Sequence, residues 1–301
     1  MSLDQRALFV HAHPDDETIN NGATMARYVA EGRGVTVVTC TAGEMGEVLV
    51  PDLLHLSHER DGGLGAHRRG EIADALAHLG VTDHRWLGGF GRFHDSGMAW
   101  HADGHAVAAE VVPDNAFWHA DLTEAADELV KVIRELRPQV LVTYNEFGGY
   151  GHPDHIQAHR VAMYAASLAA APAYKLAFGE PHDIAKIYWC AISESRMRQS
   201  LRQIRESGDT ETFEGMDPDG EMGPFVTPDE QIAACVDGTD FVHTKMDALK
   251  LHRTQVDPEG FFFSGAESGH AFWGEEFYVL AKGRRGQVGE DGLETDLFAG
   301  L

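Results

Sequence analysis

The feature that most constrains the fold of this chain is a short apolar run that ends in a dense group of polar residues. Leu8 to Val10 form the run, and residues 11–17 follow as His-Ala-His-Pro-Asp-Asp-Glu. An apolar run of this kind is typical of a parallel strand buried on both faces. In open α/β sheets, ligands bind just beyond the carboxyl ends of such strands. The histidine and aspartate side chains therefore stand where an α/β protein carries out its chemistry.

Strand and helix patterns alternate along the chain after this point. A helix is predicted over 18–32, and the β-branched run Val35–Cys40 predicts the next strand, an order that forms a right-handed parallel unit. Later strands are expected at 85–87, 140–144 and 184–190. Later helices are expected at 66–79, 122–136, 153–170, 193–206 and 241–253. The pattern predicts the α/β class, with a largely parallel sheet flanked by helices and a smaller C-terminal portion packed on it.

Other stretches lack a regular pattern. Residues 99–121 are expected to form an insertion over the surface, and the acidic, Gly- and Pro-rich residues 207–230 a long loop. The aromatic segments 261–263 and 272–280 are expected to pack the C-terminal portion back on the core. The polar tail after Gly283 is expected to be frayed.

Composition limits the partners of the chain. It has 48 acidic residues against 24 lysines and arginines, a formal net charge of −24, so its surface repels phosphate backbones and anionic membranes. Nucleic acid and membrane are therefore not expected as partners. Cys40, Cys190 and Cys235 form no CxxC pair, and the first six residues hold no hydrophobic signal core. We expect reduced thiols and a cytoplasmic protein, while the sequence does not indicate an oligomeric state.

A second polar cluster, residues 152–155 (His-Pro-Asp-His), follows the strand expected at 140–144. Taken alone, the first cluster is as compatible with a simple turn and helix cap as with a metal site. Together, the two clusters offer three protein ligands and spare acid–base groups, as a hydrolytic zinc site requires. A carboxylate beside the ion can accept a proton, and a tyrosine or histidine can stabilise an oxyanion. The pair of clusters therefore favours a metal-dependent hydrolase.

The two motifs, in this order and this far apart, resemble the LmbE-like (PIG-L) family of zinc-dependent N-acetylglucosaminide deacetylases. Shorter matches at 43–47, 91–98 and 148–152 resemble the branch of that family in mycothiol biosynthesis. The resemblance implies a Rossmann-like catalytic core over 1–170 and a C-terminal portion over 171–301 that completes the fold and the substrate cleft. It also implies the substrate, a small glycosyl-inositol (1-D-myo-inositol 2-acetamido-2-deoxy-α-D-glucopyranoside) that loses its acetyl group.

Roles carried over by position follow from the same resemblance. Three matched positions imply ligands of one Zn²⁺ ion, or of Fe²⁺, which accepts the same donors: His13, Asp16 and His155. Asp15 matches the general base that activates water, and Tyr150 matches a tyrosine that polarises the amide carbonyl. His152 matches a residue that assists as an acid or an electrostatic stabiliser.

Four further positions match residues that hold the sugar and inositol hydroxyls or lie beside them: Arg68, Asp95, Glu47 and Met98. Three of them have another interpretation, since Arg68 could pair with Glu71 on a helix, Asp95 could cap a loop, and Met98 could serve packing. Three polar residues beside the motifs are placed in other roles. His11 and Asp154 are expected to support the ligands from behind, and His159 is not expected to bind the ion.

Two other functions remain open at this point. The first is an amidase that cleaves mycothiol S-conjugates, a branch that tends to carry a lysine soon after the first motif. Residues 18–21 are Thr-Ile-Asn-Asn and include no lysine, which favours the deacetylase. The second is a non-catalytic sugar-binding protein, which would have no need of a base such as Asp15 beside a complete ligand set.

Overall fold

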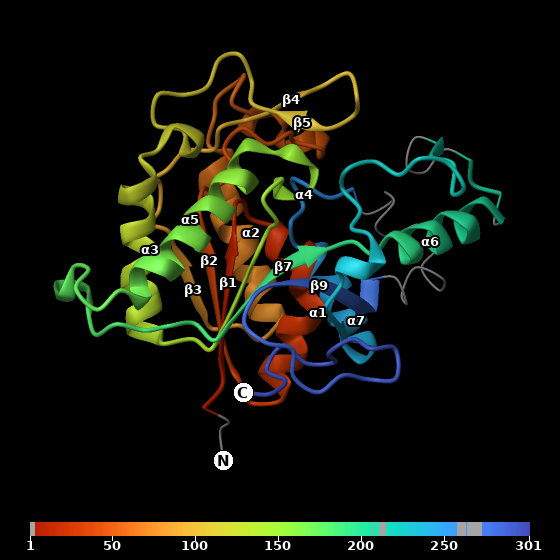
Figure 1. The fold of residues 1–301 in the computed structure, drawn as a ribbon. Helices are drawn as coiled ribbons and strands as arrows, with labels where there is room; N and C mark the ends of the chain where they lie inside the picture. The colour runs from red at the N-terminus through yellow and green to blue at the C-terminus, as the bar shows by residue number, and fades with distance from the viewer. Residues whose placement is uncertain (1–3, 207, 211–214, 258–262, 264–272) are drawn as a thin grey trace.

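A single sheet of seven strands lies at the centre of the described residues, which in this computed structural model are 4–206, 208–210, 215–257, 263 and 273–301 (Figure 1). The strands are β1 Arg6–His11, β2 Gly34–Thr39, β3 Asp83–Trp86, β6 Val140–Thr143, β7 Lys186–Ala191, β8 Ala234–Asp237 and β9 Glu275–Lys282. Their order across the sheet is β3-β2-β1-β6-β7-β9-β8; the pairs from β3 to β7 are parallel, and β9 pairs antiparallel with both β7 and β8. The predicted α/β class with a largely parallel sheet is confirmed.

Helices cover both faces of this sheet. They are α1 Asp16–Ala30, α2 Leu64–His78, α3 Leu122–Leu136, α4 Gly148–Gly151, α5 Pro153–Ala170, α6 Glu194–Glu206 and α7 Val242–Leu249. Side chains alternate along β1, so Leu8 packs under α3 and α5 while Phe9 packs under α1, α2 and α7. Both residues are fully buried. The sheet is therefore buried on both faces, as the apolar run of β1 predicted.

Shorter elements lie in the connections. They are the 3-10 helices η1 Pro51–Leu56, η2 Phe117–His119, η3 Leu176–Phe178, η5 Asp229–Gln231 and η6 Thr239–Phe241, and the antiparallel strands β4 Ala99–Trp100 and β5 Ala106–Val107. The segment 99–121, expected to lie over the surface without regular structure, thus contains a small hairpin and one 3-10 turn. No helix among the described residues is long and apolar enough to cross a membrane.

The C-terminal part of the chain departs most from the sequence-based expectations. Residues 275–282 form a strand between β7 and β8, and 234–237 form the edge strand, neither of which was predicted as a strand. The helix expected over 241–253 ends at Leu249. Residues 261, 262 and 272, part of the predicted aromatic packing, lie outside the described residues.

The prediction of a frayed tail is wrong. Both oxygens of the Glu294 carboxylate accept bonds from buried groups, at 2.5 Å from Lys186 Nζ and 2.6 Å from the Tyr188 hydroxyl. Asp296 accepts two bonds of 2.7 Å from Arg33, and Phe298 is 2% exposed. A polar tail can thus be fixed when its charges find partners in the interior, which composition alone does not reveal.

Candidate active site

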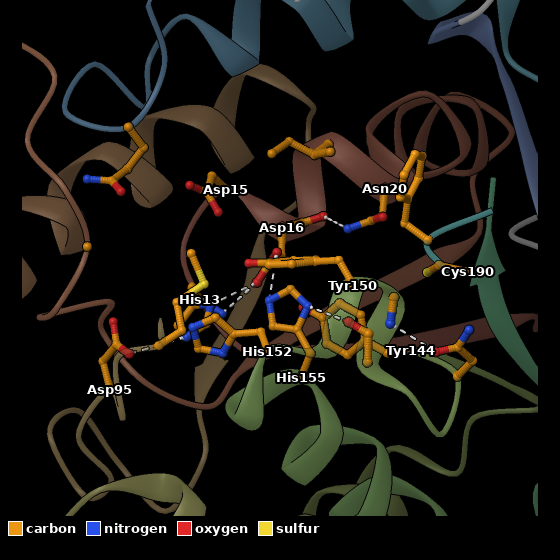
Figure 2. A pocket seen from close by; sticks show the side chains of 18 of the residues that line it. His13, Asp15, Asp16, Asn20, Asp95, Tyr144, Tyr150, His152, His155 and Cys190 are labelled. Carbon is orange, nitrogen blue, oxygen red and sulfur yellow. Dashed lines mark hydrogen bonds and ion pairs between the residues drawn. The ribbon is translucent and has the colours of Figure 1, made fainter. Parts of the chain in front are cut away.

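The loop after β1 and the start of α5 meet at the carboxyl ends of the adjacent parallel strands β1 and β6, on the floor of a pocket of about 500 Å³ (Figure 2). All ten predicted site residues line this pocket: His13, Asp15, Asp16, Glu47, Arg68, Asp95, Met98, Tyr150, His152 and His155. The structure therefore brings together residues that the sequence separates widely. The hydrogen-bond partners and distances of each side chain indicate which chemical role it can take.

His13 presents one ring nitrogen to a carboxylate behind it. Its Nε2 lies 3.2 Å from Oδ2 of Asp154, and because a carboxylate only accepts, the proton of the ring is assigned to Nε2. Nδ1 then faces Asp16, at 3.3 Å from Oδ2. Burial opposes charge on the ring, yet the carboxylates of Asp95, Asp154 and Asp16 raise the pKa of His13 well above its ordinary value. A metal at Nδ1 would take the place of a proton there.

His155 is oriented in a complementary way. Its Nδ1 lies 3.1 Å from the carbonyl oxygen of Gly148, so the proton belongs on Nδ1 and the lone pair on Nε2. That Nε2 is buried, has no hydrogen-bond partner among the described residues and lies 3.3 Å from Oδ1 of Asp16. The ring also stacks on Tyr144, with centroids 4.2 Å apart. A fixed ring with a buried, unused lone pair is what a metal ligand requires.

These donors fit a divalent ion. Ligand atoms about 2.1 Å from a tetrahedral zinc are about 3.4 Å apart. Asp16 lies 3.3 Å from a nitrogen of His13 and 3.3 Å from a nitrogen of His155. Two imidazole lone pairs and a carboxylate are also the ligand chemistry that zinc prefers. The arrangement can therefore accept a metal ion without a change of fold.

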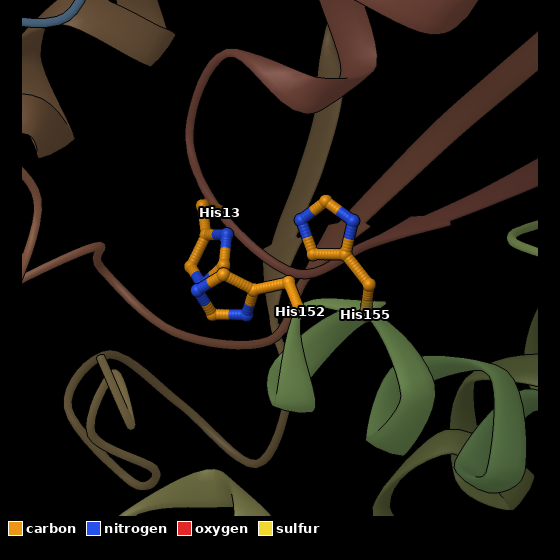
Figure 3. Close-up of side chains that lie close together, drawn as sticks. All are labelled: His13, His152 and His155. Atoms are coloured by element: carbon orange, nitrogen blue, oxygen red, sulfur yellow. The ribbon is translucent and has the colours of Figure 1, made fainter. Parts of the chain in front are cut away.

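His152 is the fourth group at this point, and its donor state differs. Nitrogens of His13, His152 and His155 lie within 4.8 Å of one another, so position alone would allow His152 as a ligand (Figure 3). However, its Nδ1 accepts a 3.1 Å bond from the N–H of Asp154 at the start of α5, which leaves the proton on Nε2. Burial, then the neighbouring His13 and His155, lower the pKa of His152 well below its ordinary value. The neutral ring is thus a hydrogen-bond donor.

Tyr150 lies on the short helix α4, which three glycines shape. Gly148, Gly149 and Gly151 all have positive φ, at 70°, 76° and 99°. A Cβ at Gly151 would lie 2.3 Å from the carbonyl oxygen of Ala106, so the turn packs closely on β5. Burial, then the charge of Asp16, raise the pKa of Tyr150. Its hydroxyl therefore keeps its proton and can donate a hydrogen bond in the pocket.

Asp15 has an unusual backbone. Its φ is 118° and its ψ −34°, a conformation that costs a residue other than glycine about 1–3 kcal/mol and is common at functional sites. Its carboxylate accepts a 3.1 Å bond from Arg68, which also binds the carbonyl oxygens of Pro14 and Gly43. Burial raises the pKa of Asp15 to about 6, against the effect of Arg68. The group is therefore poised to exchange a proton near neutral pH.

The predicted substrate residues occupy the rim and one wall. Arg68 is buried and its guanidinium bonds to Asp15, Pro14 and Gly43, whereas Glu71 binds Thr254, so the alternative of a helical pair fails. Asp95 accepts bonds from Met45 N and Gly97 N, and its carboxylate lies 3.6 Å from His13. Glu47 and Met98 are exposed at the rim. That these four residues bind substrate stays a prediction.

Several residues around the pocket were missed or undervalued. The hydroxyl of Tyr144 accepts a 2.9 Å bond from Ala12 N, but in sequence Tyr144 is only the last residue of an apolar strand. Ser96 binds Asp154 through both its backbone N–H and its hydroxyl. His11 lies 2.8 Å from the side-chain oxygen of Asn21 and 3.2 Å from the hydroxyl of Tyr144, and its supporting role stays a prediction. The second half of the chain also contributes to the pocket wall, through residues that no sequence motif marks: Cys190, Ala191, Ile192, Phe225, Thr227 and Gln255.

The fold and this group of donors define a metal-dependent hydrolase with an α/β sheet. The chain belongs to the PIG-L family, whose profile, described as GlcNAc-PI de-N-acetylase, matches residues 8–166. It is 65% identical to the 1D-myo-inositol 2-acetamido-2-deoxy-alpha-D-glucopyranoside deacetylase of Nocardioides sp., over 100% of both chains. It is 59% identical to the enzyme of the same name from Kribbella flavida, over 99% of this chain and 98% of the relative.

The fold is also found in a solved structure of lower identity. The N,N'-diacetylchitobiose deacetylase from Pyrococcus horikoshii aligns with a TM-score of 0.59 at 18% identity, over 92% of this chain and 83% of that one. At this identity the likeness concerns the fold alone. The predicted membership of the family is confirmed.

Proposed function

We propose that this chain is a deacetylase that hydrolyses the acetamide of 1D-myo-inositol 2-acetamido-2-deoxy-α-D-glucopyranoside, a reaction of mycothiol biosynthesis. The products are acetate and the free glucosaminyl-inositol. The observation that carries the proposal is the convergence of His13, Asp16 and His155 in a pocket of about 500 Å³. Full-length identity of 65% to a relative named for this reaction supports it.

Three side chains around the pocket supply the acid–base chemistry in this proposal. Asp15 accepts a proton from the attacking water as general base. The oxyanion that develops on the acetyl carbonyl accepts hydrogen bonds from Nε2–H of His152 and from the hydroxyl of Tyr150. The proton held by Asp15 passes to the nitrogen as the C–N bond breaks, so the amine leaves neutral. The donor states of His152 and Tyr150 and the position of Asp15 support these roles.

One Zn²⁺ ion per chain is the proposed cofactor, held by His13, Asp16 and His155. When bound, the ion supplies the Lewis acidity that water needs to attack an amide at neutral pH. Fe²⁺ accepts the same donors, so the two metals are compared in the test below. Asp154 supports the site from behind, because its bond to Nε2 of His13 fixes which nitrogen of that ring is free.

Substrate binding is proposed to divide between two parts of the chain. Residues 1–170 form the catalytic core, which contributes Arg68, Asp95, Glu47 and Met98 for the sugar and inositol hydroxyls. Residues 171–301 complete the fold and add the facing wall of the cleft, from Cys190 to Ile192. The three cysteines are free thiols, which suits a reducing cytoplasm.

The test is acetate release from the acetylated glycosyl-inositol by purified protein. Activity is measured as isolated, after chelation, and after return of Zn²⁺ or Fe²⁺, beside Asp15→Ala. We expect activity to disappear with the metal, to return with the physiological ion and to fall at least 100-fold in the variant. A bimane conjugate of mycothiol is assayed in parallel. Faster turnover of the conjugate would assign the chain to the amidase instead, and binding of the sugar without any turnover would indicate a sugar-binding protein.

A further inference from the structure

The strained backbone of Asp15 is held by a neighbour two residues away. The N–H of Asp15 donates a 3.0 Å hydrogen bond to Oε2 of Glu17. The side chain of Asp15 makes no cap bond to the helix that follows it, and its carbonyl oxygen accepts bonds from the N–H groups of Thr18 and Ile19. At φ 118°, well outside the ordinary regions for an aspartate, the residue depends on such contacts to keep its orientation.

Glu17 is fixed in turn from the far half of the chain. Its other oxygen, Oε1, lies 3.1 Å from Nε2 of His252 and accepts a 2.6 Å bond from the Thr18 hydroxyl. All three side chains are fully buried. The two oxygens of Glu17 thus have different partners: Oε1 contacts His252 and Thr18, and Oε2 accepts the bond from the backbone N–H of Asp15.

The shortest polar contact of His252 is with Glu17. Its Nε2 must carry a proton to satisfy the carboxylate, while its Nδ1 is buried without a hydrogen-bond partner in the described part of the chain. Thr18 Oγ1, at 3.4 Å, is the more distant neighbour of the same Nε2. Burying Nδ1 without a hydrogen-bond partner is unfavourable, so the contact of Nε2 with Glu17 is the polar interaction that accounts for the position of this histidine.

We propose that His252 and Glu17 are positioning residues, which hold the backbone of Asp15 in the conformation that aims its carboxylate into the pocket. This rests on the proposed role of Asp15 as general base. Arg68 restrains the carboxylate itself and Glu17 restrains the peptide N–H, in addition to the bonds that the Asp15 carbonyl oxygen accepts from the first turn of α1. Residues near the end of the chain thereby control the geometry of a residue near its start.

The chain contains a matched control for a purely structural role. Glu276 is also buried, accepts bonds from the backbone N–H groups of Ala23 and Thr24 in α1, and pairs at 2.7 Å with Lys245 of α7. Lys245→Ala therefore removes the partner of a buried glutamate that also binds α1, but one that does not reach Asp15. Comparison with His252→Ala separates loss of stability from loss of positioning.

The experiment measures kcat, KM and melting temperature of the metal-loaded enzyme. We expect both alanine variants to have a lower melting temperature than the wild type. His252→Ala should lose about 10- to 100-fold in kcat while its KM stays within about twofold of the wild-type value. Lys245→Ala should keep the wild-type kcat. His252→Gln keeps an N–H donor and should recover most of kcat. Equal kcat losses in His252→Ala and Lys245→Ala, or no recovery in His252→Gln, would overturn the proposal.

A second readout does not depend on the reaction. Hydrogen–deuterium exchange at the amide of Asp15, followed by NMR, should be at least tenfold faster in His252→Ala than in the wild type and unchanged in Lys245→Ala. Should the wild type release no acetate, the proposed function fails while this measurement still decides the positioning. Unchanged exchange in His252→Ala would show that Glu17 holds Asp15 without help from His252, contrary to the proposal.

Discussion

The Nε2 atom of His155 lies 3.3 Å from Oδ1 of Asp16, yet no hydrogen bond joins them. A close, buried pair of this kind is unfavourable unless a third group binds both atoms. The other oxygen of the same carboxylate makes the corresponding approach to His13. The relationship is the strongest structural argument for a shared metal ion.

Metal content should therefore distinguish ligands from neighbours. Asp16→Asn and His155→Ala are expected to reduce the metal bound per chain from about one ion to near zero, because each variant changes one of the proposed protein ligands. His152→Gln is the control, since its Nδ1 is occupied by Asp154 N, and it should keep the metal while losing activity. Elemental analysis after dialysis checks this, and loss of metal from His152→Gln would show that the ligand set has been misassigned.

The titration of Asp15 provides a prediction about pH. In the metal-free protein its carboxyl should titrate near pH 6, because burial raises its pKa from 3.8 to about 6. Bound metal should lower that value, since a nearby positive charge favours the carboxylate. Carbon NMR of labelled aspartate measures both states. A metal-free carboxyl that titrates near 4, like an exposed aspartate, would contradict the burial seen here.

A glycine pair tests the turn that carries Tyr150. Gly151→Ala places a Cβ 2.3 Å from the carbonyl oxygen of Ala106 at φ 99°, so the turn must move and kcat should fall about tenfold or more. Gly89→Ala is the control, because Gly89 has a similar φ of 103° but no atom within 4 Å of the added Cβ. It should lose about 1–2 kcal/mol of stability and keep its kcat. Similar kcat values in the two variants would show that the turn does not need its packing on β5.

The docked tail gives a prediction about stability. Burial opposes ionisation of Asp296, but Arg33, Phe298 N and Tyr28 lower its pKa below 3.8 in the folded chain. A lowered folded pKa means that the contribution to stability is complete well above pH 3.8 and is lost as the pH falls through the folded value. Asp296→Ala should therefore cost about 1–3 kcal/mol at pH 6, and the cost should shrink steadily as the pH is lowered below 3.8, measured by denaturant unfolding. A cost that does not change with pH would exclude the ion pair as its source.

Much of the catalytic half could be predicted from the sequence because its signals are local. The run Leu8–Val10 marks a buried strand, and the polar groups that follow β1 and β6 lie together because those strands are parallel neighbours. The helices over 122–136 and 153–170 have the bounds expected of them. In each case the residues that determine the structure lie within a few positions of one another.

The remainder depends on partners far away in the sequence. The contact of Glu17 with His252 joins the two ends of the chain, and neither residue lies in a pattern that names the other. The strand Glu275–Lys282 was missed since its acidic start and mixed burial resemble no buried parallel strand. Asp296 looks like a residue of a solvated tail until Arg33 is placed beside it. Tertiary pairing, and not local propensity, decides these features.

The order of the strands has a consequence for how the enzyme matures. The proposed metal donors all precede residue 156, and the strands beneath them, β1 and β6, are synthesised before β7, β8 and β9. Because chains emerge from the ribosome N-terminus first, a nascent chain can assemble the ion-binding floor while its substrate wall is still untranslated. His252 arrives later still, so the base would reach its final aim only near the end of synthesis.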